Sequence, residues 1–303
     1  MEKKKPSLMS ITRMRQLFTS LTPESRRHIF VNNELAMVQG DHAIFSLIMQ
    51  QRPPFVINDH RLGIVVKGQL RANINLVEKQ ITAGMLVFIG PGTIISPRAV
   101  SDDLAVVGVG LSPEFSMPFA AGGLPSAFNG QERDFQLRPS DSDIEAARAI
   151  IDALWRIVHL RDYNRLAVAS LVAALMQHYD SLYRQQTQLL SATLSREQTT
   201  FDRFIYLVNR HAATEHQMAF YARKMCLTER YLGTVIRQAS GVTAKEWIDR
   251  AIVTRIEVEL RHSDKTIAQI ADDLHFPNPS FFCKYFKRLT GQTPVEYRMR
   301  QGD

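Results

Sequence analysis

The last hundred residues of this 303-residue chain contain the same pattern twice. At an offset of 50 residues, chemically similar side chains recur in the same order, in the pairs Leu232/Phe282, Ile236/Phe286, Arg237/Lys287, Gly241/Gly291, Thr243/Thr293, Glu246/Glu296 and Trp247/Tyr297. Closer to the start of the repeat the offset becomes 49, which pairs Ala222 with Ala271 and Leu227 with Phe276. A repeat of this length predicts one structural unit that occurs twice.

The second copy has the spacing of two short helices joined by a turn. From Thr266 to Leu274 the apolar residues share one helical face, and Pro277 follows directly after the turn. Asn278 can cap a new helix whose first position is Pro279. The buried stripe of this new helix is expected at Phe282, Tyr285, Phe286 and Leu289. Gly291 is expected to end the helix in a left-handed conformation, before a capping box that starts the next helix.

The first copy follows the same plan. We expect a capping box at Thr214–Gln217, a helix at Met218–Met225 and a second helix from Glu229. Two helices with such a short turn describe a helix-turn-helix, whose second helix can enter the DNA major groove. The helix predicted at Thr243–His262 joins the copies. At about 1.5 Å per residue it is about 28 Å long, close to one turn of DNA.

The charge distribution agrees with a nucleic-acid partner without proving one. The chain has a formal net charge of +7. Between Leu274 and Val295 there is no acidic residue, whereas Lys284, Lys287 and Arg288 lie there. A basic stretch of this kind is equally typical of a solvated helix surface, so the repeat decides the interpretation.

At these residues the chain resembles the DNA-binding domain of the AraC/XylS family of transcription regulators. The resemblance is carried by Ile267-Ala-Gln-Ile-Ala271 and by the stretch from Phe276 to Arg298. It implies base-facing positions at Arg230, Gly233 and Thr234 in the first copy and at Pro279, Ser280 and Lys284 in the second. Gly233 and Pro279 offer no side-chain donor, so the expected base contacts are Arg230, Thr234, Ser280 and Lys284. Arg237, Lys287 and Arg288 are expected to contact phosphates. Where the family has glycine before the turn phenylalanine, this chain has His275.

The amino-terminal half has the alternation of β-strands. From about Phe30 to Phe115, apolar residues recur at every second position, as in Arg61–Val77 and Ile81–Ile89, with turn residues between the runs. This pattern predicts a small barrel or jelly roll. The positions of Gly68, Gly84, Phe88 and Pro91 resemble the cupin-type ligand domain of many AraC-family regulators.

The residues for cupin metal chemistry are not in place. The region Phe55–Leu70 offers His60 alone, and Ile94 and Ile95 occupy the expected later His position. We therefore expect no metal, no cofactor, no catalytic residues and no enzymatic activity, and His60 is expected on a surface loop. The effector and its binding residues are unknown from the sequence. Arg61, Arg71 and Arg98 are candidates to anchor an acidic ligand.

Two helices are expected after the barrel. Ser142-x-x-Glu145 predicts a capping box before the first, and the second is expected at Leu166–Leu182. They either cover the barrel or form the seam of a homodimer, as the family implies. The predicted fold is α+β: a cupin-like jelly roll with a helical pair, then an all-α domain with two helix-turn-helix motifs. The predicted domains are a sensor domain with an N-terminal helix, a dimerisation pair, a linker and a DNA-binding domain, at 1–138, 139–184, 185–197 and 198–303.

These features predict a sequence-specific DNA-binding transcription regulator controlled by a small molecule or partner at its amino-terminal domain. Its partner is double-stranded DNA, and contact with RNA polymerase is consistent with this function. The alternatives are a jelly-roll metalloenzyme and a partner-binding module that does not contact DNA. With two cysteines and no apolar run of about 18 residues, the protein is expected in the cytoplasm, away from membranes.

Overall fold

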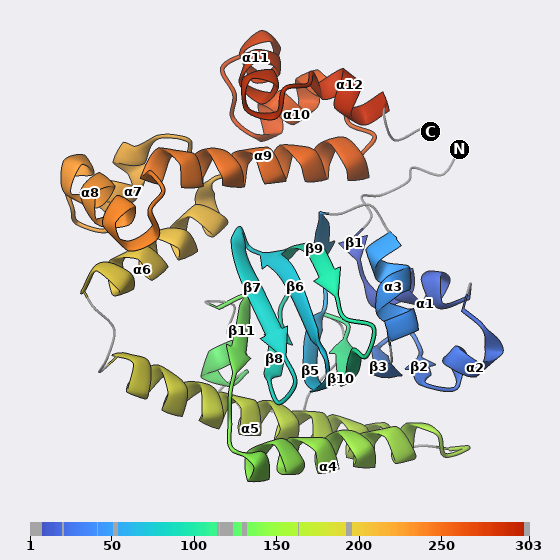
Figure 1. Ribbon diagram of the computed structural model, residues 1–303. Coiled ribbons are helices and arrows are strands. Elements are labelled where there is room, and N and C mark those ends of the chain that lie inside the picture. Colours follow the sequence, from blue (N-terminus) through green and yellow to red (C-terminus); the bar gives the residue numbers. More distant parts are fainter. Residues whose placement is uncertain are drawn as a thin grey trace. The chain divides into compact units, whose positions relative to one another are not determined.

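The structure is a computed structural model that describes residues 8–19, 21–40, 42–50, 54–113, 115, 124–128, 132–162, 164–191 and 196–299. The chain divides into an amino-terminal unit, Leu8–Leu190, and a carboxyl-terminal unit that begins at Ser191 (Figure 1).

Two β-sheets form the centre of the amino-terminal unit. The five-stranded sheet has the order β1 (Leu8–Met9), β4 (Phe55–Ile57), β9 (Ile94–Val100), β6 (Gln69–Ile74) and β7 (Val77–Thr82). The six-stranded sheet has the order β11 (Asp134–Leu137), β8 (Leu86–Ile89), β5 (His60–Lys67), β10 (Ala105–Leu111), β3 (Leu35–Gly40) and β2 (Ile29–Val31). Neighbouring strands are antiparallel, except that β1 pairs parallel with β4.

The alternation in the sequence sorts the apolar residues of the six-stranded sheet between two cores. On β5, Leu62 and Ile64 belong to a core that includes residues of two helices, whereas Val65 belongs to a core shared with the five-stranded sheet. On β10, Val107 and Val109 lie in the first of these cores. Because successive side chains of a strand point to opposite faces, the six-stranded sheet is a middle layer. The predicted jelly-roll-like β-fold is confirmed.

Helices surround these sheets. They are α1 (Ile11–Phe18), α2 (Pro23–Arg26), α3 (His42–Gln50), α4 (Asp141–Val158), α5 (Arg165–Ser191) and a single 3-10 turn, Ser126–Phe128. The helix α3 lies inside the region that was expected to be strands. Its apolar run, Ile44–Ile48, is too short for periodicity to separate a strand from a helix.

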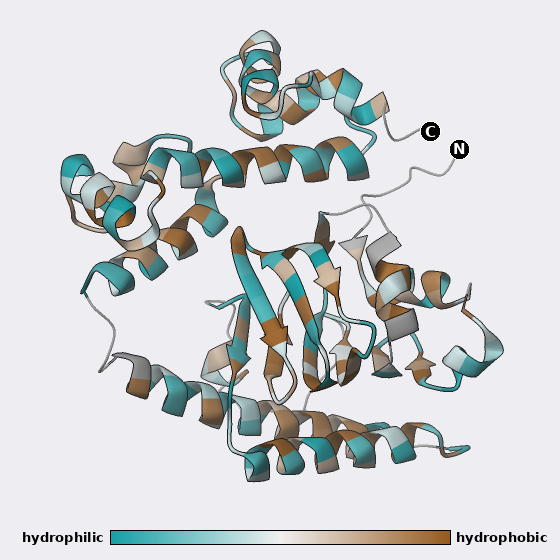
Figure 2. Ribbon diagram, in the orientation of Figure 1, coloured by the Kyte–Doolittle hydropathy of each residue, from teal (hydrophilic) through white to brown (hydrophobic). Residues whose placement is uncertain are grey.

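The predicted helical pair exists, with corrected ends. Ser140, and not Ser142, caps α4, because its hydroxyl accepts a hydrogen bond from the Asp143 amide. Figure 2 shows hydrophobic residues along α4 and α5 interleaved with hydrophilic ones, and the buried ones pack on the six-stranded sheet. The two helices therefore cover the β-fold. The interval 185–197, expected as the linker, begins inside α5 and ends inside the next helix.

The carboxyl-terminal unit is helical throughout its described elements. They are α6 (Arg196–His211), α7 (Met218–Lys224), α8 (Glu229–Ser240), α9 (Ala244–His262), α10 (Ile267–Asp273), α11 (Pro279–Thr290) and α12 (Pro294–Met299). In Figure 1, α7 and α8 lie near one end of α9, α10 and α11 lie over its middle, and α12 lies toward its other end. The predicted α+β fold class is therefore confirmed. None of the helices among the described residues has the length and apolarity needed to cross a bilayer.

Candidate nucleic-acid interface and ligand cavity

The two helix pairs α7/α8 and α10/α11 turn through the same backbone conformation. Cys226 in the first turn has φ of 56° and His275 in the second has φ of 53°. In each turn the next amide donates to a carbonyl five residues back, from Leu227 to Ala222 and from Phe276 to Ala271. This left-handed helix end normally uses glycine, so both copies hold a residue with a Cβ in a conformation that disfavours it.

The second helix of each pair, here called the recognition helix, begins and ends as its sequence predicts. Thr228 caps α8 through the Tyr231 amide, and Asn278 caps α11 through the Phe281 amide. Gly241 and Gly291 end the two helices with φ of 72° and 79°. The expected caps are thus confirmed at both recognition helices. The first helices differ: Thr266 caps α10 in a capping box, whereas Gln217, which precedes α7, makes no side-chain capping hydrogen bond. The box expected at Thr214–Gln217 is therefore wrong.

Each recognition helix carries a polar stripe on its exposed side. In α8 the stripe is Arg230, Thr234 and Arg237, and in α11 it is Ser280, Lys284 and Lys287. All six side chains are exposed, and the spacing i, i+4, i+7 places each set on one helical face. The offset of 50 superposes the two stripes residue by residue. The geometry thus groups the residues expected to contact bases with those expected to contact phosphates.

Hydrogen bonds within the helices limit what some of these residues can donate. The Thr234 hydroxyl donates to the Arg230 carbonyl at 3.0 Å, so toward DNA it remains an acceptor. The Arg288 guanidinium lies 5.4 Å from the centre of the Tyr285 ring, which holds it beside the stripe of α11. Gly233 is half-buried with the Met218 Cε atom 3.2 Å from the position of a Cβ, so a larger residue there would press on α7.

Sequence reasoning missed two aromatic side chains beside the stripes. Tyr231 and Phe281 are related by the offset of 50 and are 42% and 51% exposed. Exposed aromatic groups at equivalent places in both copies are available for apolar contacts outside the unit. The repeat itself carried the signal, because both residues lie one position before the buried stripe.

Side chains fix both recognition helices to α9. The Tyr285 hydroxyl of α11 donates to Asp249 at 2.5 Å, and Lys245 also binds Asp249 at 2.6 Å. At the first copy the Trp247 indole donates to the Ser240 hydroxyl at 3.0 Å. Burial and the Asp249 carboxylate raise the pKa of Tyr285 well above its usual value, so this phenol remains a donor. Both recognition helices are therefore attached to the same helix, α9.

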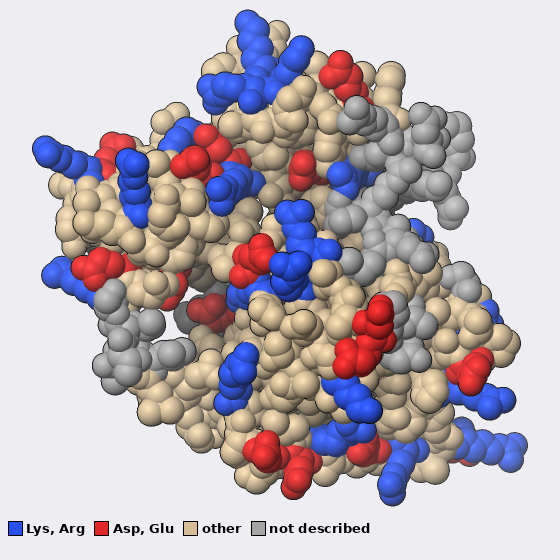
Figure 3. Space-filling model, viewed as in Figure 1, with Lys and Arg blue, Asp and Glu red and all other residues tan. Residues whose placement is uncertain are grey.

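Basic side chains concentrate on these surfaces. Figure 3 shows Lys and Arg side chains projecting from the outer part of the α10–α11 region. There the expected phosphate-binding residues Lys287 and Arg288 are exposed next to Lys284. At the first copy Arg237 is exposed on α8, but Glu229 adds a negative charge at the start of that helix. The two copies therefore differ in charge although they share a backbone.

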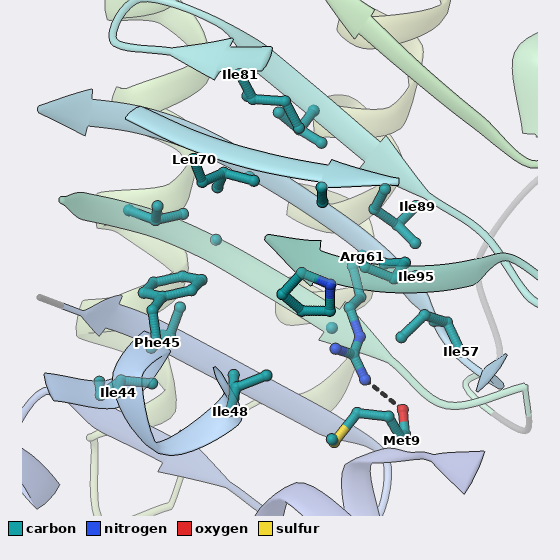
Figure 4. A pocket seen from close by; sticks show the side chains of 18 of the residues that line it. Met9, Ile44, Phe45, Ile48, Ile57, Arg61, Leu70, Ile81, Ile89 and Ile95 are labelled. Atoms are coloured by element: carbon teal, nitrogen blue, oxygen red, sulfur yellow. Dashed lines mark hydrogen bonds between the residues drawn. The ribbon is translucent and has the colours of Figure 1, made fainter. Parts of the chain in front are cut away.

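A separate cavity lies in the amino-terminal unit, between the two sheets and α3. Its volume is about 230 Å³. Figure 4 shows the apolar side chains that enclose it, among them Phe45 and Ile48 of α3, Leu70 of β6 and Ile95 of β9. Arg61 also lines it and is turned toward Met9, whose carbonyl accepts a hydrogen bond from the guanidinium. Protein interiors contain few voids larger than a water molecule, so this is a candidate ligand site.

Of the other residues considered for ligand or metal binding, Arg71 also lines this cavity, whereas Arg98 and His60 do not. Arg98 is exposed on β9, and Arg71 is exposed on β6, 3.8 Å from Glu78. His60 is half-buried and stacks on Phe88, so its expected place on a surface loop is wrong. Burial lowers the pKa of His60 below its usual value. Within the described ranges, no three His, Cys, Asp or Glu residues are grouped so that they could hold a metal ion.

One family of known proteins matches most of the carboxyl-terminal unit. The family model described as "Helix-turn-helix domain" matches residues 221–300. The chain is 28% identical over 93 residues to regulatory protein PocR of Salmonella typhimurium, covering 31% of each chain. It is 25% identical over 178 residues to the transcriptional activator RhaR of Cronobacter sakazakii, covering 59% of this chain and 61% of RhaR. The arabinose operon regulatory protein of Escherichia coli is 25% identical over 93 residues, covering 31% of this chain and 32% of that protein.

The alignments thus span about a third of PocR and three fifths of RhaR. Among solved structures, ToxT of Vibrio cholerae is 17% identical with a TM-score of 0.34, covering 80% of this chain and 90% of ToxT. The DNA-binding domain of AdpA in complex with a target DNA is 19% identical with a TM-score of 0.31, covering 33% of this chain and 90% of that domain. PocR, RhaR and the arabinose regulator are AraC/XylS-family proteins. Residues 221–300 thus match a helix-turn-helix family, and the carboxyl-terminal unit is similar to regulators of the AraC/XylS family.

Proposed function

We propose that this protein is a sequence-specific DNA-binding transcription regulator whose amino-terminal unit binds a small-molecule effector. The observation that carries the proposal is the pair of exposed polar stripes on α8 and α11, both fixed to α9. The 19 residues of α9 span about 28 Å, so the recognition helices can reach successive major grooves. The protein acts by binding and not by catalysis.

Within each stripe, some residues contact bases and others contact phosphates. Arg230 can make two hydrogen bonds to guanine, Lys284 can donate to guanine, and Ser280 can contact any base. Thr234, whose hydroxyl remains an acceptor, can receive a hydrogen bond from adenine or cytosine. Arg237, Lys287 and Arg288 neutralise phosphates and set the position of the helices on the duplex. Tyr231 and Phe281 add apolar contacts. In this proposal the protein works in the cytoplasm, where its DNA is, and the homodimer and the contact with RNA polymerase remain predictions.

The test begins with selection of genomic fragments by the purified full-length protein, which supplies an operator. We expect Arg230→Ala and Lys284→Ala each to weaken operator binding by about 1–3 kcal/mol, or about 5- to 150-fold. Arg98→Ala and Lys67→Ala remove the same charges from exposed strand positions in the amino-terminal unit and should leave operator affinity nearly unchanged. Equal losses in all four variants would show that only net charge matters and would reject the assigned reading surfaces.

The salt dependence of binding separates this function from its alternatives. Phosphate contacts release counterions, so the logarithm of the operator affinity must fall steeply with the logarithm of the salt concentration. A partner-binding module predicts no such DNA affinity. A jelly-roll metalloenzyme predicts a stoichiometric transition metal in the purified protein, which elemental analysis would reveal.

A further inference from the structure

We propose that the cavity between the two sheets binds an uncharged, apolar molecule of about nine carbon atoms. Only the description of this molecule as the effector rests on the proposed function. The walls of the cavity, the residues that leave it open and the neutralisation of its partly buried arginine support the binding site itself.

The walls of the cavity are hydrocarbon on nearly every side. Apart from glycine backbone and two arginines, the described residues that line it are aliphatic, aromatic, methionine or proline side chains. A water molecule in a protein interior needs two to four polar partners, and such a wall does not supply them. An apolar cavity of about 150 Å³ in another protein stays dry and binds benzene, so about 230 Å³ corresponds by the same scale to about nine carbon atoms.

Glycines on the six-stranded sheet leave part of this space open. Gly63, Gly108 and Gly110 line the cavity from β5 and β10. A Cβ at Gly108 would lie 2.6 Å from the Leu62 carbonyl oxygen, so sheet packing requires glycine there. A Cβ at Gly110 would lie 3.8 Å from the Ala36 Cβ and 3.9 Å from the Arg61 Cγ, which are ordinary contacts. The fold therefore tolerates a side chain at Gly110, and its absence keeps volume available to a ligand.

The charge of Arg61 is already neutralised. Asp59 is 1% exposed, and its carboxylate receives hydrogen bonds from Arg61 Nε at 2.7 Å and from Nη2 at 3.3 Å. The same Nη2 donates to the Met9 carbonyl. An anionic ligand would have to displace Asp59 from Arg61, which would leave a buried carboxylate without a partner. Arg71, the other charged residue among those that line the cavity, is exposed and close to Glu78.

This arrangement argues against an acidic ligand, for which Arg61, Arg71 and Arg98 were the candidate anchors. Arg61 is the one of the three whose side chain is partly buried, and it is committed to Asp59 and to the amino-terminal strand. With a buried ion pair at one end and hydrocarbon elsewhere, the cavity discriminates by charge. It should accept a neutral molecule and reject the carboxylate of the same size.

Calorimetric titration of the full-length protein at neutral pH with three probes tests the ligand class. The probes are 1-nonanol and indane, which are neutral, and nonanoate, which has the same chain length as nonanol but carries a charge. We expect at least one neutral probe to bind, and 1-nonanol to bind at least about tenfold more tightly than nonanoate. Nonanoate binding as tightly as 1-nonanol, or no binding of either neutral probe up to its solubility limit, would overturn the proposal.

Two variants test the site. Gly110→Val fills the cavity and should weaken neutral-probe binding at least about tenfold, whereas Ala99→Val, a control on β9 among residues that do not line this cavity, should not. Asp59→Asn leaves Arg61 uncompensated, so nonanoate affinity should rise about tenfold while 1-nonanol affinity changes little. If a folded Gly110→Val protein bound the neutral probes with unchanged affinity, the cavity would not be the binding site. If Asp59→Asn left the affinity for nonanoate unchanged, the ion pair with Asp59 would not be what excludes an anion. The Asp59→Asn variant also provides a test if Gly110→Val does not fold.

Operator binding measured on the same preparations separates the two proposals. Probe binding by a protein that binds no DNA would reject the regulator and leave the ligand site standing. Operator binding without probe binding would reject the ligand site alone. A probe that binds without changing operator affinity or transcription would reject its description as an effector.

Discussion

The two helix-turn-helix pairs have the same backbone but different surface chemistry. Both place a residue other than glycine in the left-handed turn, both end the recognition helix at a left-handed glycine, and both continue into a capping box, at Thr243 and Thr293. On the stripes, however, Arg230 of α8 corresponds to Ser280 of α11, and Thr234 corresponds to Lys284. The long cation is therefore one helical turn further along in the second copy.

The two copies share the caps, the glycines and the buried apolar residues, which specify the fold. In the proposed function, the exposed stripes differ because each contacts different base pairs. The anchors to α9 differ as well: Tyr285 binds Asp249, but the corresponding Val235 has no polar group. An operator made of two identical direct repeats is therefore not expected, since each recognition helix should select its own base pairs.

Exchanging the stripes should have the largest effect. The double variant Arg230→Ser, Thr234→Lys gives α8 the two expected base-contacting residues of α11, and it should change the preferred bases of one half-site while leaving the other half unchanged. Each bidentate contact discriminates by about 1–3 kcal/mol, so affinity for the original operator should fall by about 5- to 150-fold. In vitro selection with both proteins measures the change.

The reciprocal variant Ser280→Arg, Lys284→Thr is the matched control. It should change the other half-site. Selection of the original operator by both variants would mean that these side chains do not read the bases, and that the difference between the two stripes has another origin.

The sequence predicted the carboxyl-terminal unit almost completely because its signals are local. Asn278, Pro279 and Gly291 each determine the backbone at their own position, and the structure has the expected conformation at each. The missing cap of α7 shows the limit, since Gln217 begins the helix without a side-chain hydrogen bond. The exposure of Phe281 could not be separated from burial by spacing alone, because it adjoins the apolar stripe.

The amino-terminal site could not be predicted in the same way. Strand alternation indicated a β-fold, but the cavity depends on which strands lie opposite each other. Register places Gly110 beside Ala36 on one side and Arg61 on the other, and these pairings join residues far apart in the chain. The neutralisation of Arg61 by Asp59 is local, yet the burial of Asp59, which makes the pair matter, follows from the tertiary fold.

Relief of the backbone strain at Cys226 and His275 should have the next largest effect, which is on the free energy of unfolding. A left-handed residue with a Cβ costs about 1–2 kcal/mol, and the greater freedom of glycine in the unfolded chain offsets about 0.4–1 kcal/mol of that. We therefore expect His275→Gly and Cys226→Gly each to raise the free energy of unfolding by about 0.5–1 kcal/mol, measured by urea denaturation.

Gly241→Ala and Gly291→Ala provide the opposite test. No atom lies within 4 Å of a Cβ built at either position, so the cost of alanine there comes from the backbone alone. Each should lower the free energy of unfolding by about 1 kcal/mol. If His275→Gly stabilised the protein while Cys226→Gly destabilised it, or the reverse, the two turns would not share one backbone conformation.

The weakest effect is expected on the pH dependence of stability at His216, which has a lysine at the corresponding position of the second copy. The offset of 49 relates His216 to Lys265. The ring of His216 lies 4.7 Å from that of Phe276, and burial lowers its pKa, whereas hydrogen bonds to Asp273 and Glu259 raise the pKa of Lys265. A histidine whose pKa is lower in the folded state binds protons less readily than in the unfolded chain, so stability should fall as the pH falls below about 6.5. His60 adds a change of the same sign, because burial lowers its pKa too.

The variant His216→Phe isolates the contribution of this ring, since it keeps the aromatic contact and removes the titration. Urea denaturation between pH 5 and pH 8 should show a weaker loss of stability on acidification than in the unchanged protein, and His60→Phe provides the same comparison for the amino-terminal unit. Because His216 precedes the first pair and contacts the turn of the second, its protonation loosens a contact between the two copies. Parallel pH profiles for His216→Phe and the unchanged protein would mean that the ring is already solvated, and that the contact with Phe276 does not join the copies.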